Sequence, residues 1–128
     1  MPDFKNYTIL VVDDDPDIRE LISAIFLRVG YKTLTADCGL NALEIVNSTS
    51  IDVVVTDIRM PNGDGLFLLE KIRTRDPKVP IVFIVTGYSD ISESEFISKG
   101  ATKVFLKPFS QILLVDEVNC SLGLQSAT

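Results

Sequence analysis

The sequence predicts a single α/β domain in which a parallel sheet, with strands in the order 2-1-3-4-5, lies between two layers of helices. Short runs rich in Val and Ile alternate with stretches whose apolar residues recur at helical spacing, which is typical of a parallel sheet covered on both faces. The runs at 8–12, 52–56 and 80–85 are apolar throughout, whereas those at 31–35 and 103–106 are mixed or short. We therefore expect the mixed runs at the sheet edges.

The first strand ends in three acids, Asp13, Asp14 and Asp15. Asp15 is suited to cap the following helix, Pro16 to begin it and Gly30 to end it. The spacing predicts a core stripe of Ile18, Leu21, Ile22, Ile25 and Val29.

The run at 31–35 alternates Lys32 and Leu34 with Tyr31, Thr33 and Thr35, a mixed composition that favours a half-exposed edge strand. Leu40, Leu43 and Val46 then mark a second helix, which we expect to close at the turn formed by residues 47–50.

The third strand stops abruptly at Asp57, and the chain turns through residues 61–63. Asp64 is a plausible cap for the helix that follows, and Asp76 with Pro77 ends it. Its predicted core residues are Leu66, Leu69 and Ile72.

The fourth strand is the most apolar and ends at Thr86, and the fifth ends at Lys107. The helix predicted between them, 89–99, has few large apolar residues and is expected to be weakly held. Those residues are Ile91, Phe96 and Ile97. A last helix is expected over residues 110–122, with a core stripe of Leu114, Val115, Val118 and Leu122.

The length, net charge and apolar stretches of the chain limit the classes of function that it can have. A chain of 128 residues can bury about two-thirds of its unfolded surface, so we expect one domain over 1–128 with a core at about 7–124. The formal charge of −6 disfavours nucleic acid as a direct partner. No apolar stretch reaches the roughly 20 residues of a membrane span and no signal-like segment begins the chain, so we expect a cytoplasmic protein without a membrane partner.

The composition also limits the chemistry. The chain has no histidine, which excludes Ser-His-Asp and Cys-His catalysis and His-ligated zinc. Cys38 and Cys120 show no disulfide framework, and we expect both to be buried free thiols in a reducing compartment.

In the predicted strand order, strands 1 and 3 are neighbours at the point where the chain reverses direction, and ligands bind outside the carboxyl ends of strands there. Asp13, Asp14 and Asp57 should meet at that point, with Thr86 and Lys107 beside them. Each has an ordinary explanation alone: a helix start, a solvent-facing acid, a strand-end hydroxyl, a solvated lysine. Carboxylates this close together repel, so as a set they should recruit a divalent cation, and Mg²⁺ suits best.

The ordered set of motifs resembles one family along essentially the whole chain, the two-component response regulator receiver domains. Its members have a flavodoxin-like (βα)5 fold, a three-layer sandwich. The same strand order is known for flavodoxin and for a chemotaxis regulator of this family, so the resemblance and the strand composition are not independent predictors. The matching residues are Asp13-Asp14, Asp57 within Asp-Ile-Arg-Met-Pro-Asn-Gly-Asp-Gly, Thr86, Gly100-Ala101 and Lys107-Pro108-Phe109.

The resemblance implies that Asp57 accepts a phosphoryl group from a phosphohistidine on a sensor histidine kinase or a histidine phosphotransfer protein. It implies Mg²⁺ bound by Asp14, Asp57 and the backbone carbonyl of Arg59, with Asp13 acting through a water. The chain would then be a signalling module that takes part in its own phosphorylation and autodephosphorylation, and not an enzyme. The side chain of Arg59 either tunes hydrolysis or only reaches into solvent.

The resemblance further implies that Lys107 and Thr86 contact phosphoryl oxygens, that the Lys107–Pro108 peptide is cis, and that output runs through the face formed by helix 4, strand 5 and helix 5. The family's usual aromatic residue is Val104 here, and Phe105 should point to the opposite side of the strand. We therefore expect helix 4 to carry more of the response.

Other readings remain open. A haloacid-dehalogenase-like phosphatase also uses a strand-end Asp nucleophile and Mg²⁺, but that family has a second Asp two residues after the nucleophile, where this chain has Arg59. A phosphorylation-independent binding scaffold is the other alternative. The chain would be a stand-alone regulator or a domain of a longer regulator or hybrid kinase, and its partner would be an output domain or an effector protein. Its kinase and pathway are not encoded in any motif. Ile112, Leu113 and Leu124 exceed what one buried stripe needs, so they are candidates for a homodimer face, although scattered apolar side chains on a surface are normal.

Overall fold

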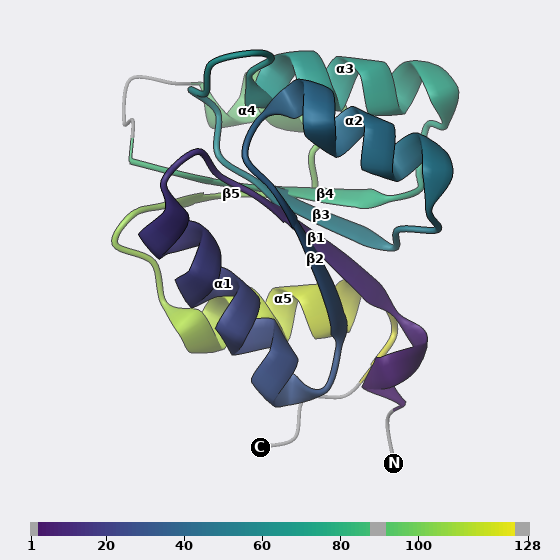
Figure 1. Ribbon diagram of the computed structural model, residues 1–128, viewed down its shortest axis with the longest axis vertical. Helices are drawn as coiled ribbons and strands as arrows, with labels where there is room; N and C mark the ends of the chain where they lie inside the picture. Colours follow the sequence, from purple (N-terminus) through teal and green to yellow (C-terminus); the bar gives the residue numbers. More distant parts are fainter. Residues whose placement is uncertain (1–2, 88–91, 125–128) are drawn as a thin grey trace.

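The computed structural model describes residues 3–87 and 92–124, which form a parallel sheet of five strands in the order β2-β1-β3-β4-β5 (Figure 1). The predicted fold class and strand order are confirmed, with the mixed strands at the two edges. The strands are β1 (Thr8–Val12), β2 (Lys32–Ala36), β3 (Val53–Thr56), β4 (Ile81–Thr86) and β5 (Lys103–Leu106).

The central strands are apolar throughout because both of their faces are covered. In β1, Ile9 and Val11 pack into the core on one face of the sheet, and Leu10 and Val12 into the core on the other. The edge strand β2 buries only Ala36. This difference in burial explains why the strand order could be predicted from composition.

In the described residues, two α-helices cover one face of the sheet and three cover the other (Figure 1). The helices α1 and α5 share a core with residues such as Phe83 and Phe105, whereas α2, α3 and α4 pack on the face that includes Val104. Val104 and Phe105 thus lie on opposite faces, as predicted. The helices are η1 (Phe4–Asn6, a 3-10 helix), α1 (Pro16–Val29), α2 (Gly39–Ser48), α3 (Gly65–Arg75), α4 (Glu93–Ser98) and α5 (Gln111–Ser121).

Side-chain caps set the starts of α1 and α3 as predicted. Asp15 accepts a hydrogen bond from the Asp17 N–H, and Asp64 accepts one from the Phe67 N–H, so each satisfies an N–H group that the helix leaves without a partner. Gly30 ends α1 with a φ of 120°, a conformation that glycine adopts without the steric cost of a Cβ.

Some predicted core positions were wrong. Leu21 and Leu40 are 41% and 54% exposed, while Phe26 and Ala42 are fully buried in their helices. A helical stripe at spacings of three and four is broad, so the pattern alone does not decide which of its borderline positions faces the sheet. The helix α2 also continues to Ser48, into the turn expected at 47–50.

Cys38 is buried as predicted, but Cys120 is exposed. Two residues before it, Val118 is fully buried. Positions two apart lie on opposite sides of a helix, so Cys120 faces away from the sheet.

The helix α4 is shorter than the predicted 89–99 and begins after its cap, Ser92. The expected core residue Ile91 lies outside the described residues. Within α4 Phe96 is buried, whereas Ile97 is 43% exposed. In the part of the chain that the structure describes, no helix is long and apolar enough to cross a membrane.

Candidate functional site

The acids that end β1 and β3 lie side by side because these strands are neighbours in register. Val12 pairs with Thr56 at the last position of the two strands, and the Asp57 N–H donates to the Val12 carbonyl at 3.0 Å. The next residues along, Asp13 and Asp57, are therefore brought together at the carboxyl edge of the sheet. Both are buried, with exposed fractions of 2% and 8%.

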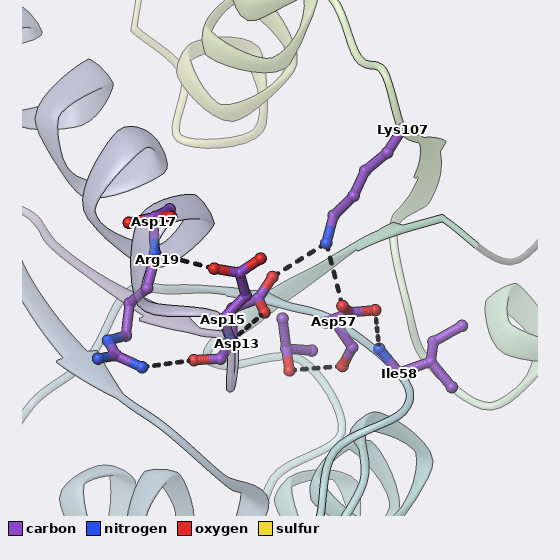
Figure 2. A network of polar contacts seen from close by, with 8 residues as sticks. Asp13, Asp15, Asp17, Arg19, Asp57, Ile58 and Lys107 are labelled. Atoms are coloured by element: carbon purple, nitrogen blue, oxygen red, sulfur yellow. Dashed lines mark hydrogen bonds and ion pairs between the residues drawn. The ribbon is translucent and has the colours of Figure 1, made fainter.

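Lys107, which follows β5, bridges these two acids (Figure 2). Its Nζ lies 3.0 Å from Oδ2 of Asp13 and 3.0 Å from Oδ2 of Asp57. One ammonium group thus partly neutralises two buried carboxylates, which would otherwise be costly to bury. The Lys107–Pro108 peptide is cis, as the family resemblance implied.

Asp57 is further oriented by the backbone around it. Its Oδ1 accepts a hydrogen bond from the Ile58 N–H at 2.7 Å (Figure 2), and its carbonyl oxygen accepts one from the Thr56 hydroxyl at 2.8 Å. These contacts fix both the carboxylate and the main chain that carries it. The Asp57 carboxylate therefore has a fixed direction at the carboxyl edge of the sheet.

The charge states of Asp13 and Lys107 follow from burial and from each other. Burial raises the pKa of the Asp13 carboxyl, and hydrogen bonds from Asp15 and Lys107 offset only part of this effect. Burial on its own would lower the pKa of Lys107, but hydrogen bonds to Asp57 and Asp13 outweigh it and raise that pKa above its ordinary value. Lys107 is therefore a cation at neutral pH.

Three carboxylates suit a hard divalent cation at this edge. Asp13, Asp14 and Asp57 each offer an oxygen, and these atoms all lie within 4.8 Å of one another. Asp14 is exposed, so a cation bound there keeps access to water, as Mg²⁺ requires. Both oxygens of Asp13 accept hydrogen bonds, from the Asp15 N–H and from Lys107, and both oxygens of Asp57 accept them from the Ile58 N–H and Lys107. A carboxylate oxygen has two lone pairs, so each of these oxygens can still face a cation or a water bound to it.

The two other predicted site residues lie at a strand end or in the loop after one. Thr86 is fully buried at the end of β4, and its carbonyl accepts a hydrogen bond from the Lys107 N–H at 2.8 Å. Arg59 follows Asp57 by two residues, in the loop after β3, and is exposed.

The loop between β3 and α3 is held by backbone contacts that need glycine. The Gly39 and Leu40 N–H groups, at the start of α2, donate to the carbonyls of Gly63 and Asn62 at 2.8 and 3.1 Å. These loop carbonyls accept hydrogen bonds from N–H groups that the first turn of α2 leaves without a partner, where Cys38 provides no side-chain cap. A Cβ on Gly39 would lie only 2.5 Å from the Gly63 oxygen, so the close approach depends on glycine.

Sequence reasoning did not single out Arg19, in the first turns of α1. Its Nη1 donates to the Asp13 carbonyl oxygen at 2.8 Å (Figure 2). The contact joins residues six apart across a strand end and a helix start, and neither the helical pattern nor a motif marks it.

Fold and site together define a class: parallel α/β domains in which acids at the topological switch point face a strand-end lysine. A family model for the response regulator receiver domain matches residues 9–119. The chain belongs to this family, and it is a receiver domain of two-component signalling systems. The phosphatase and scaffold alternatives receive no support from these matches.

Relatives with known names agree with this assignment. Sporulation initiation phosphotransferase F from Bacillus subtilis is 36% identical over 124 residues, covering 94% of this chain and 98% of that protein. The uncharacterized transcriptional regulatory protein YrkP, also from B. subtilis, is 39% identical over 105 residues, which are 82% of this chain. The chain spans only 45% of the length of YrkP and 23% of that of the regulatory protein AtoC from Escherichia coli.

Solved structures agree as well. The receiver domain of the Francisella response regulator 1452 has a TM-score of 0.85 and 32% identity, and the match covers 92% of this chain and 98% of that one. The CheX–CheY–BeF3–Mg²⁺ complex from Borrelia burgdorferi has a TM-score of 0.82 and 26% identity, covering 91% and 89%.

Proposed function

We propose that Asp57 is the phosphoryl acceptor and that its partner is a phosphohistidine on a sensor histidine kinase or a histidine phosphotransfer protein. The observation that carries the proposal is the Lys107 ammonium group 3.0 Å from Oδ2 of both Asp13 and Asp57. The chain contains no histidine, so the phosphohistidine has to come from another protein. A relative named as a phosphotransferase supports the same chemistry.

In the transfer, a carboxylate oxygen of Asp57 attacks the phosphorus atom and forms a P–O bond. The P–N bond to the partner's imidazole breaks, and the nitrogen keeps the electron pair. The product is an acyl phosphate on Asp57, so the chain reacts with its partner as a signalling module and not as an enzyme with a separate substrate. Its residues contribute mainly position and charge, as in other phosphoryl transfers.

Lys107 has a defined part in this step. Its ammonium group already contacts the Asp57 oxygen and has three N–H donors, so it can turn to an oxygen of the phosphoryl group. The Thr86 hydroxyl, from the end of β4, would pair with another oxygen. Mg²⁺ held by Asp14, Asp57 and the Arg59 carbonyl, with Asp13 acting through a water, would supply further charge neutralisation. The complex with CheY that contains BeF3 and Mg²⁺ supports this ligand chemistry.

The surface formed by α4, β5 and α5 is proposed as the output face. It carries exposed apolar side chains, which favour a protein partner, whether an effector, an output domain or a second copy of the chain. Those side chains are Ile97, Leu106, Ile112 and Leu113. Hydrogen exchange of residues 93–98 should change when a phosphoryl mimic binds, and equal protection in both states would count against α4 as the responding element.

The proposal treats residues 1–128 as one receiver domain and places it in the cytoplasm with its phosphohistidine partner. Its test is incubation with Mg²⁺ and a small phosphodonor such as acetyl phosphate, followed by intact-mass measurement. Wild type should gain one phosphoryl group, and Asp57→Asn, which matches the size of aspartate, should gain none. If Asp57→Asn were modified as well as wild type, Asp57 would not be the acceptor.

A further inference from the structure

A side chain of helix α1 fixes the carbonyl oxygen of the peptide group between Asp13 and Asp14. The Asp13 carbonyl oxygen accepts a hydrogen bond from Arg19 Nη1 at 2.8 Å. On the other side of the residue, the Asp13 N–H donates to the Ala36 carbonyl at the end of β2, at 3.2 Å. The backbone of Asp13 is therefore held from α1 and from β2 at once.

Asp14 depends on this backbone for its direction. Its side chain is exposed, whereas Asp13 is buried and its carboxylate is oriented by Asp15 and Lys107. The plane of the Asp13–Asp14 peptide decides where the Asp14 side chain projects, because a peptide group is rigid. A contact that fixes the Asp13 carbonyl thus fixes the start of Asp14.

We propose that Arg19 is a positioning residue for the metal-binding acids: by holding the Asp13 carbonyl, its guanidinium aims Asp14 toward Asp57. This inference rests on the proposed function, since it assumes that Asp14 and Asp57 bind Mg²⁺. Groups that orient the ligands of a metal often affect its affinity nearly as much as the ligands do.

Two possible roles of Arg19, through its charge and through its hold on the Asp13 carbonyl, predict opposite changes in Mg²⁺ affinity when the residue is replaced. The guanidinium is a cation near a cation site, so if it acted only through its charge, removing it would strengthen Mg²⁺ binding. If it acts by holding the Asp13 carbonyl, removing it frees the peptide to rotate and weakens binding. The sign of the change in affinity separates the two roles.

The test compares Arg19→Met, which keeps the apolar stem and loses the donor, with Arg28→Gln, which removes one positive charge from the last turn of the same helix. Calorimetric titration should give Arg19→Met a dissociation constant for Mg²⁺ about tenfold above wild type, and Arg28→Gln one that is unchanged. Thermal unfolding checks that each variant is folded. If Arg19→Met does not fold, Arg19→Gln, whose shorter side chain withdraws the donor, takes its place.

A second measurement excludes general damage to the site. At saturating Mg²⁺, phosphorylation of Arg19→Met by acetyl phosphate should return to the wild-type rate, because only the metal affinity is affected. Unchanged or tighter Mg²⁺ binding in Arg19→Met would overturn the inference, and so would a rate that stays low at saturating Mg²⁺. Failure of the wild type to bind Mg²⁺ would instead overturn the proposed function on which the inference rests.

Discussion

Gly65, the first residue of α3, should tolerate no side chain. A Cβ built there would lie 2.9 Å from the Ile58 Cα and closer still to the Asp57 carbonyl oxygen. Both are backbone atoms of the segment that carries Asp57, the proposed phosphoryl acceptor, so neither can move aside as a flexible side chain can. The Gly65 N–H also donates to the Ile58 carbonyl at 2.6 Å, and relief of the clash would lengthen that bond.

The size of the effect follows from these contacts. Forcing extra atoms into a packed site costs typically 1–3 kcal/mol, and weakening one backbone hydrogen bond adds about 1 kcal/mol. The better helix propensity of alanine offsets up to about 1 kcal/mol of this loss. Gly65→Ala should therefore lower the free energy of unfolding by about 2 kcal/mol. With about 2.1 cal/mol/K of unfolding entropy per residue and 128 residues, the expected fall in Tm is about 7 °C.

Calorimetric thermal unfolding in EDTA measures this directly. Gly87→Ala is the matched control, because a Cβ at Gly87 meets nothing within 4 Å, and alanine there should leave Tm unchanged or raise it slightly by restricting the unfolded chain. The same shift of the loop should weaken Mg²⁺ binding in Gly65→Ala. A Gly65→Ala protein as stable as Gly87→Ala would refute the reasoning.

Three other changes test different contacts. Lys107→Met should lower the free energy of unfolding in EDTA by about 2 kcal/mol, which is below the 3–5 kcal/mol of a fully buried pair because the lysine is partly exposed. Added Mg²⁺ should stabilise this variant more than it stabilises the wild type. A variant as stable as the wild type in EDTA would contradict this prediction. Tyr31→Phe removes the hydrogen bond to buried Asn119 and should cost about 1–3 kcal/mol in urea unfolding, whereas Tyr7→Phe should cost little; similar losses would show that the buried bond is not the cause. Hydrogen bonds from two backbone N–H groups lower the pKa of Asp76, so its carboxylate stabilises the fold above its ordinary pKa and that contribution is lost as pH falls through the lower folded value. An NMR titration of Asp76 with a midpoint at or above 3.8 would contradict this stabilising role of its carboxylate.

The sheet could be predicted because strand composition reports burial. Three strands are covered on both faces and read as unbroken apolar runs, whereas β2 buries only one residue. The helical faces were harder, as Leu21 and Leu40 demonstrate, because each helix can rotate slightly and still bury most of its stripe. Asn119 lay beyond prediction: it is 2% exposed only because Tyr31, 88 positions away in sequence, gives its side chain a partner.

Some contacts of the site could likewise be predicted from the sequence, and others could not. That Asp13, Asp14 and Asp57 meet follows from strand order alone, since the carboxyl ends of neighbouring parallel strands share one edge. That Lys107 contacts Asp13 as well as Asp57 depends on side-chain reach across three strands, and no spacing in the sequence encodes it. The glycine contacts around the loop after β3 and the hold of Arg19 on the Asp13 carbonyl likewise appear only when the elements are packed.

The most direct test of the account is to identify the residue that carries the phosphoryl group. Wild-type protein phosphorylated by acetyl phosphate and Mg²⁺ is reduced with borohydride, which converts an aspartyl phosphate to homoserine, and its peptides are sequenced. We predict homoserine at position 57 and aspartate at positions 13 and 14. Homoserine at Asp13 or Asp14, with Asp57 unchanged, would contradict it.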